Sequence, residues 1–264
     1  MTRDSEVQNW VSSEVFIDWT DLRSAHAQCR SVLTRLAADR DLLTLLVDRI
    51  ADDEDLFRDA DHHPVMDRLT LWRDMERGIY LRLHVSPGNN ELIPHDHKYS
   101  FTTYILRGSY THVWRRRTAP YRGKFSSEHV PLGLVTCERV GSCYTLGYSL
   151  VHQTMMEADT VTLFMRGPGE QGSSYAAQDM LDRVDGGNRA DGDQSAPATT
   201  AARKHTDGQR PLELNEYRRL RHRLMTLGAL GPVSKSRPAP PGAGSGLTST
   251  QGRGPAPRPD QRAR

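Results

Sequence analysis

The stretch ELIPHDHKYSFTTYILRGSYTHVW, residues 91–114, determines the fold prediction for this chain. It places two histidines, His95 and His97, one residue apart and follows them with alternating β-forming residues and a glycine. Side chains two residues apart on a strand point to the same face of a sheet. The pattern therefore predicts that both imidazoles reach one point on one side of a β-sheet.

Other segments between about residues 68 and 168 repeat with the same period of two. They read LTLW, IYLRLHVS, EHVPLG, VTCERV, CYTLGYSLVHQ and TVTLFMRGP, and glycine or proline separates them. Seven or eight short strands without helices between them are typical of an antiparallel sandwich or barrel, a jelly roll among them. The predicted fold class is mainly β, with the barrel over residues 67–184.

Residues 20–57 repeat with a helical period instead, and Asp21 is placed to cap the first helix. Residues 1–66 are therefore predicted to form an N-terminal helical segment that packs on the barrel. The apolar positions of the two helical segments are Leu22, Ala25, Cys29, Val32 and Leu36, then Leu42, Leu45, Leu46 and Ile50.

The composition changes after residue 184. Residues 185–211 are polar and rich in glycine and alanine, which is typical of a linker. The segment PLELNEYRRLRHRLMTLGAL predicts an isolated helix over residues 212–229. Residues 230–264 are rich in proline, glycine and arginine, so a disordered C-terminal tail is expected.

Charge and cysteine content limit the classes of function. The formal net charge is +2 over 264 residues, which gives no reason to expect a nucleic-acid or membrane partner. Cys29, Cys137 and Cys143 form no CxxC pair, so a reducing, cytoplasmic setting fits best. The N-terminal residues lack the apolar core of a signal peptide, and no apolar run is long enough to span a membrane.

A third histidine is needed if the pair binds a catalytic metal. Imidazole nitrogen is a ligand for zinc, iron, copper and nickel. The other histidines of the β region are His84, His112, His129 and His152. Spacing favours His152, because it lies on a later predicted strand after Gly141 and Gly147.

This arrangement resembles the two short motifs of the cupin superfamily. The first motif is a histidine pair, a glutamate and a glycine. Here Gly108 matches the glycine, but Phe101 stands at the glutamate position. In the second motif Gly141 matches the first glycine and His152 the histidine. The resemblance covers about residues 68–178, and it implies a double-stranded β-helix in which His95, His97 and His152 hold a metal.

Without the glutamate, the metal set is similar to that of cysteine-dioxygenase-like enzymes, which hold ferrous iron with three histidines. The resemblance implies a non-haem Fe(II) oxygenase that uses dioxygen and a small, carboxylate-bearing, amino-acid-like metabolite. Cysteine itself is in doubt as the substrate, because the strand that carries the Ser-His-Tyr set of mammalian-type cysteine dioxygenases shows Thr162, Phe164 and Arg166 here.

Four further residues are candidates for the pocket. Arg82 and Arg166 are candidate clamps for a substrate carboxylate, which guanidinium binds bidentately. Tyr148 stands four residues before His152, so equal strand parity makes it the first candidate proton donor near the metal. The candidate catalytic residues are Tyr148 and Arg82. Tyr104 is a third candidate for contact with substrate.

Other readings of the same residues remain open. Zinc or another divalent metal on the same ligands favours an isomerase, lyase or hydrolase. A cupin that has lost its metal would bind a small ligand or a partner without catalysis. The run WRRRTAPYRGK, residues 114–124, could contact phosphate or RNA, although a solvated hairpin tip is the favoured interpretation. Cupins often dimerise through their strands, which leaves a homodimer open.

Overall fold

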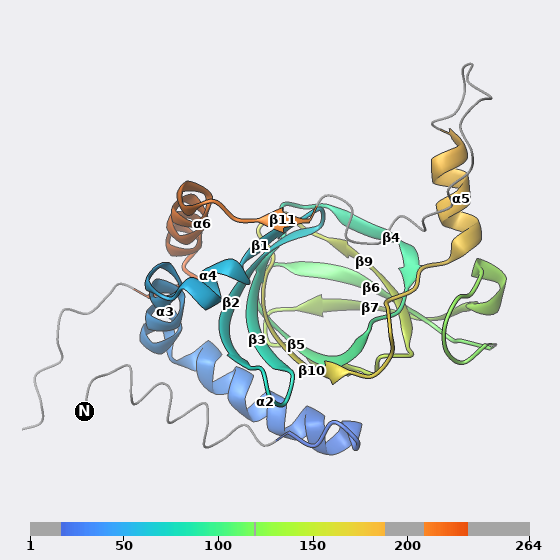
Figure 1. The fold of residues 1–264 in the computed structure, drawn as a ribbon, viewed down its shortest axis with the longest axis horizontal. Coiled ribbons are helices and arrows are strands. Elements are labelled where there is room, and N and C mark those ends of the chain that lie inside the picture. Colours follow the sequence, from blue (N-terminus) through green and yellow to red (C-terminus); the bar gives the residue numbers. More distant parts are fainter. Residues whose placement is uncertain (1–16, 119, 188–208, 232–264) are drawn as a thin grey trace, which may run out of the picture. The chain divides into compact units, whose positions relative to one another are not determined.

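The computed structural model describes residues 17–118, 120–187 and 209–231, and every structural statement below concerns these residues. Two antiparallel sheets face each other and form a barrel (Figure 1). The strands are β1 (Asp61–His63), β2 (Met66–Asp74), β3 (Ile79–Val85), β4 (Asn90–His95), β5 (Tyr99–Arg107), β6 (Ser109–Arg115), β7 (Leu132–Arg139), β8 (Cys143–Leu146), β9 (Val151–Met156), β10 (Val161–Gly169) and β11 (Arg210–Pro211).

The order of the strands is that of a jelly roll. One sheet runs β11-β1-β2-β3-β10-β5-β8 and the other runs β4-β9-β6-β7. The barrel begins with β3 and ends with β10, and these two strands pair with each other. The strands between them in sequence are divided between the two sheets. This is the arrangement of two Greek keys wound into a double-sheet barrel. The prediction of a mainly β, jelly-roll fold is confirmed.

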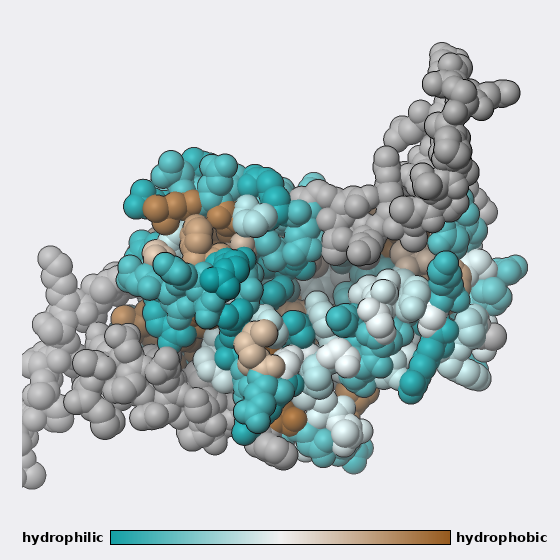
Figure 2. Space-filling model, viewed as in Figure 1, coloured by the Kyte–Doolittle hydropathy of each residue, from teal (hydrophilic) through white to brown (hydrophobic). Residues whose placement is uncertain are grey.

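Three helices cover the outer face of the larger sheet: α2 (Leu22–Ala38), α3 (Arg40–Arg49) and α4 (Glu54–Arg58). The backbone N–H of Arg23 donates to Asp21 Oδ1 at 3.0 Å, so the predicted cap is confirmed. Alternate residues of β3 and β10, such as Leu83 and Leu163, share one apolar core with the helices. Figure 2 shows that the solvent side of α3 and α4 is hydrophilic, as an amphipathic helix requires.

The predicted isolated helix is not isolated. Helix α6 (Leu214–Thr226) packs into the same core, where Leu224 is fully buried. The Tyr217 hydroxyl donates to the carbonyl oxygen of Val47 at 2.7 Å, and Arg221 forms an ion pair with Asp48 of α3. The sequence period predicted the helix but could not show which surface it covers.

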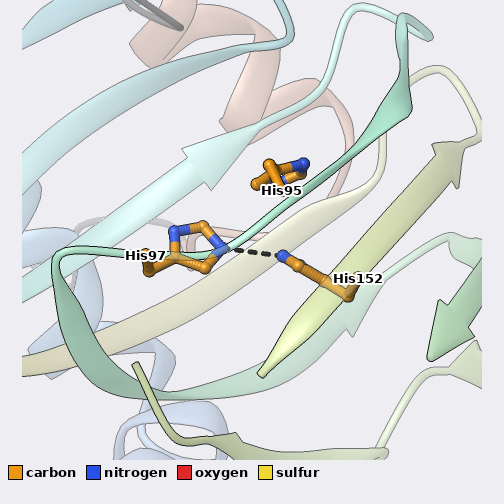
Figure 3. A group of neighbouring side chains, drawn as sticks. All are labelled: His95, His97 and His152. Carbon is orange, nitrogen blue, oxygen red and sulfur yellow. Dashed lines mark hydrogen bonds between the residues drawn. The ribbon is translucent and has the colours of Figure 1, made fainter. Parts of the chain in front are cut away.

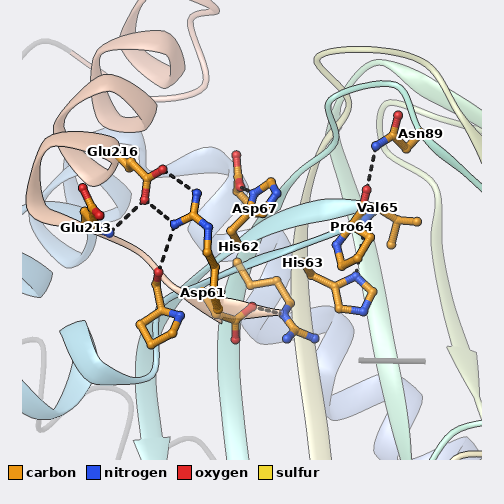
Figure 4. A network of polar contacts seen from close by, with 12 residues as sticks. Asp61, His62, His63, Pro64, Val65, Asp67, Asn89, Glu213 and Glu216 are labelled. Atoms are coloured by element: carbon orange, nitrogen blue, oxygen red, sulfur yellow. Dashed lines mark hydrogen bonds and ion pairs between the residues drawn. The ribbon is translucent and has the colours of Figure 1, made fainter. Parts of the chain in front are cut away.

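The two-residue strand β11 fixes the start of α6 to the edge of the sheet (Figure 4). Arg210 donates to both oxygens of Glu216, at 2.7 and 2.6 Å. Next to it, Arg68 of β2 donates to Asp61 of β1 at 2.6 Å. These contacts connect the C-terminal segment to the first strands of the barrel.

Some predicted boundaries differ from the structure. The segment EHVPLG contains a 3-10 turn over Ser127–His129, and CYTLGYSLVHQ divides into β8 and β9 at residues 147–150. Helix α5 (Gln178–Gly187) crosses the predicted end of the barrel at residue 184. Most of the predicted linker and tail, residues 188–208 and 232–264, lies outside the described residues. No helix in the described ranges is long and apolar enough to cross a bilayer.

Candidate metal centre

Three histidines meet on the inner side of the barrel (Figure 3). His95 is the last residue of β4 and is the direct cross-strand partner of His152 on β9. His97 lies in the turn between β4 and β5 and not on a strand. The prediction that strand parity brings His95 and His97 to one face is therefore wrong for His97, which reaches the site through the turn.

The three imidazoles lie close together. The Nε2 atoms of His97 and His152 are 2.7 Å apart, and the His95 ring centroid is 5.1 Å from that of His97 and 4.6 Å from that of His152. One nitrogen of each ring lies within 4.8 Å of the others. His95 is fully buried and His152 is 3% exposed. The predicted convergence of the imidazoles from separate strands is confirmed.

A backbone carbonyl determines the tautomer of His95. Its Nδ1 atom lies 3.0 Å from the carbonyl oxygen of Ile93, which can only accept a hydrogen bond. The proton of neutral His95 is therefore on Nδ1, and Nε2 keeps the lone pair that a metal requires.

A second buried histidine determines the tautomer of His152. His152 Nδ1 lies 2.8 Å from Nε2 of His112, which is fully buried. Burial lowers the pKa of His112 to about 3, so this ring is neutral and carries one proton. Its Nδ1 faces Glu138 Oε1 at 3.8 Å, which places that proton on Nδ1. His112 Nε2 then accepts from His152 Nδ1, and His152 Nε2 is left as a donor for metal.

The donor set fits a divalent transition metal. Neutral imidazole nitrogens, oriented by a carbonyl and by a further histidine, are typical of ligands to iron, zinc, copper or nickel. The residues that would hold such an ion are His95, His97 and His152.

A buried ion pair holds the turn that carries His97. Asp96 is fully buried and accepts from Arg117 Nη1 at 2.7 Å, Tyr175 N–H at 2.7 Å and Gln171 Nε2 at 3.0 Å. Burial raises the pKa of Asp96, while the hydrogen bond from the Tyr175 backbone opposes that rise. Arg117 is only 4% exposed at its side chain. The interpretation of residues 114–124 as a solvated hairpin tip is therefore wrong for Arg117.

An aromatic wall borders the His97 side of the site. The Phe101 ring meets His97 edge-on at 4.7 Å and lies 4.8 Å from the Phe164 ring. With Leu146 these rings form a small buried cluster. The side of the site next to His97 is therefore apolar.

Arg166 is already engaged by the protein. Its guanidinium lies 3.9 Å from the Tyr80 ring centre and 4.5 Å from that of Tyr99, and it donates to the carbonyl oxygens of Gly78 and Gly167. Tyr99 in turn stacks on His97 at 6.2 Å. These contacts place Arg166 near the site but occupy much of its hydrogen-bonding capacity.

Arg82 is less engaged. Its Nε atom is buried and has no hydrogen-bond partner in the part of the chain that the structure describes. Burial lowers its pKa, and the positive charge of Arg68 adds to that effect. Arg82 pairs across the sheet with Phe164 of β10, which lines the aromatic wall. A buried cation of this kind favours a bound anion.

The structure does not place the predicted tyrosines at the metal centre. Tyr148 lies in the turn between β8 and β9, under the guanidinium of Arg122 at 5.3 Å, so strand parity with His152 does not apply. Its carbonyl oxygen accepts from the backbone of His97 at 3.2 Å. Tyr104 packs against the core beneath the helices, on the face opposite to Phe101. Tyr104 therefore lies away from the three histidines, and its contact with substrate stays a prediction.

Two other tyrosines lie beside the histidines. The hydroxyls of Tyr110 and Tyr144 share a hydrogen bond, and the Tyr144 ring lies 4.8 Å from the His112 ring. Burial raises the pKa of both phenols, so both remain protonated. Sequence reasoning did not select His112 or Tyr110, although both lie on β6 in alternate positions, as an inward-facing pair must.

No family model and no curated protein matches the sequence. Solved structures similar to this chain include KdgF from Halomonas sp., with 14% identity, a TM-score of 0.31, and coverage of 45% of this chain and 88% of that one. An RmlC-like cupin from Shewanella frigidimarina has 11% identity, a TM-score of 0.30 and coverage of 40% and 79%. Oxalate decarboxylase from Bacillus subtilis has 14% identity, a TM-score of 0.33 and coverage of 48% and 33%. At these scores the likenesses carry no argument, and the fold assignment rests on the strand pairing.

Proposed function

We propose that this protein is a mononuclear metalloenzyme in which His95, His97 and His152 hold Fe(II), and that it oxygenates a small carboxylate-bearing metabolite. The observation that carries the proposal is the convergence of three imidazole nitrogens inside the barrel, within 4.8 Å of one another. Ferrous iron in such a set would supply dioxygen activation and leave positions for substrate beside it.

Each nearby residue has a task in this proposal. Arg82 binds the substrate carboxylate, because its buried guanidinium has hydrogen-bonding capacity to offer. Phe101 and Phe164 exclude water from the reacting groups. Tyr144, which burial keeps protonated, holds a proton near His112. We further propose that the substrate is amino-acid-like.

A non-redox reaction on the same ligands is the second candidate. The three imidazoles are neutral donors that suit zinc as well as iron. Bound zinc would supply Lewis-acid catalysis and support an isomerase, lyase or hydrolase. Arg82 and the aromatic wall would orient the substrate in the same way.

Elemental analysis of anaerobically purified protein tests the proposal. We expect stoichiometric metal in the wild type and in His222→Ala, which changes an exposed histidine of α6. His97→Ala and His152→Ala should lose the metal. Bound iron with substrate-dependent oxygen uptake supports the oxygenase, whereas zinc without oxygen uptake supports the Lewis-acid enzyme. A wild type that binds no divalent metal would overturn both.

A further inference from the structure

We propose that Glu91 is the fourth protein ligand of this centre. The site would then consist of three histidines and one carboxylate, with the acidic ligand supplied by β4, four residues before His95. This inference rests on the proposed function only in requiring a metal. It changes the character of the centre, because a carboxylate lowers its net charge and occupies a position that substrate or water would otherwise take.

The register between β4 and β9 brings Glu91 to the same face as the histidines. Glu91 is the cross-strand partner of Thr154, and His95 is the partner of His152. Thr154 and His152 are two residues apart on β9, so their side chains share a face. Their partners on β4 are four residues apart, because an irregularity between Glu91 and His95 adds residues to that strand. Glu91 and His95 therefore both face inward.

The distance between Glu91 and His95 fits two ligands of one ion. Glu91 Oε2 lies 3.7 Å from His95 Nε2, the nitrogen that the hydrogen bond to Ile93 leaves for metal. Donors that bind one ion at about 2.0–2.2 Å each lie no more than about 4.4 Å apart. An ion on His95 Nε2 thus has the carboxylate within reach of that one ligand. The group whose nitrogens lie within 4.8 Å of one another comprises the three histidines without Glu91, so the Glu91 side chain has to move toward His97 and His152 to bind the same ion.

The surroundings hold the Glu91 carboxylate in place. Its side chain is 10% exposed, and Oε2 accepts from Thr154 Oγ1 at 3.0 Å. A carboxylate has about four acceptor sites on two oxygens, so it can bind a metal without losing Thr154. The hydroxyl then orients the carboxylate as an outer partner orients a metal ligand. Phe101, at the position where the motif has glutamate, leaves the anionic ligand to come from elsewhere.

Glu138 provides a matched comparison. Its Oε1 atom lies 3.8 Å from His112 Nδ1, and its side chain is 12% exposed, so it resembles Glu91 in burial and in distance to an imidazole. Glu138 differs from Glu91 because it faces His112, which hydrogen-bonds to His152 and is not one of the three histidines of the site. A neutral isosteric change at the two glutamates therefore separates ligation from a general effect of buried charge.

Titration of the metal-free full-length protein with Co(II) and Zn(II) tests the proposal. We expect Glu91→Gln to weaken metal affinity at least about 100-fold and to change the visible absorption of bound Co(II), because a ligand is lost. Glu138→Gln should weaken affinity by no more than the roughly 10–100-fold that loss of an outer partner causes, and it should leave the Co(II) spectrum unchanged, because no ligand is lost.

The outcomes distinguish this inference from the proposed function. A wild type that binds metal, together with a folded Glu91→Gln variant of unchanged affinity and spectrum, overturns the role of Glu91 and leaves the three-histidine enzyme intact. A wild type that binds no metal overturns the proposed function itself. If Glu91→Gln does not fold, a crystal structure of the zinc-loaded wild type decides the matter. A carboxylate bonded to zinc supports the proposal, and one lying beyond about 3 Å overturns it.

Discussion

At the scale of single residues, the most informative feature beside the aromatic wall is Arg82, whose guanidinium lies 5.1 Å from the Tyr80 ring centre. Most arginines described here have an acidic or carbonyl partner, as Arg117 has in Asp96 and Arg68 has in Asp61. Arg82 presents a buried Nε without a hydrogen-bond partner in the described ranges. A buried cation without a hydrogen-bond partner lowers the free energy of unfolding. Proteins keep such a residue where a bound ligand offsets this loss.

Replacement of Arg82 by methionine should separate stability from binding. We expect Arg82→Met to raise the free energy of unfolding by about 0.5–2 kcal/mol in the absence of substrate, because a buried cation is removed. The same change should raise KM, or the Kd for small carboxylic acids, by at least tenfold. Chemical denaturation and calorimetric titration measure the two effects.

Arg58→Met is the control for that experiment. Arg58 lies in an exposed pair with Asp55 at 3.0 Å, with a side chain that is 68% exposed. Its replacement should change neither the free energy of unfolding nor the free energy of carboxylic-acid binding by more than about 1 kcal/mol. An Arg82→Met protein that is destabilised and still binds acids normally would show that Arg82 has only a structural role.

At the scale of elements, the turn between β4 and β5 is positioned from outside itself. Asp96 connects it to Arg117 after β6 and to the backbone of Tyr175 before α5. Gln171 also donates to the carbonyl oxygen of His97 at 2.9 Å. Two segments that are distant in sequence, the one after β6 and the one between β10 and α5, thus hold the turn that carries the His97 imidazole.

Removal of one side of this ion pair should affect both stability and metal binding. We expect Arg117→Met to lower the free energy of unfolding by about 3–5 kcal/mol, because it leaves the Asp96 carboxylate buried without its cation. Metal affinity should fall by about 10–100-fold, because His97 is no longer held in position. Urea denaturation of the metal-free protein and metal titration provide the two measurements.

The double variant Asp96→Asn/Arg117→Met completes the test. It should recover part of the lost stability, since the charge that lacked a partner is gone, but it should not recover metal affinity. Recovery of full metal affinity in the double variant would contradict the positioning role of the pair.

At the scale of the whole molecule, buried neutral histidines connect the fold to pH. His84 is 9% exposed, and its ring packs against Phe164 at 4.5 Å. Burial lowers its pKa well below the usual value, and the charges of Arg68 and Arg82 add to that effect. The unfolded chain binds a proton at this histidine below about pH 6.5, and the folded protein does not. The contribution of neutral His84 to the free energy of unfolding is therefore fully present above that pH and declines below it.

The acid sensitivity should be visible in global unfolding. Between pH 6.5 and pH 5, the free energy of unfolding of the metal-free wild type should fall by about 1.4 kcal/mol per pH unit through His84 alone. His84→Gln should lack this contribution, so that its curve of stability against pH is flatter by that slope. Parallel curves for the two proteins would show that His84 titrates normally in the folded state.

The sequence by itself determined the elements and the chemistry of the main ligands. The change from helical to strand period located the N-terminal helices and the β region, because burial of one face leaves a period in the chain. The spacing of His95, His97 and His152 identified the three imidazoles, because the spacing of a short motif can be read directly along the chain.

Only the tertiary structure decided which residues surround those imidazoles. His112 and Glu91 reach the site through cross-strand pairing, whose register includes an irregularity in β4 that no local pattern reveals. Strand parity did not locate Tyr148, because a parity argument requires an uninterrupted strand and Tyr148 lies in the turn between β8 and β9. Helix α6 likewise has an apolar face in the sequence, but its partner surface on α3 exists only once the chain is folded.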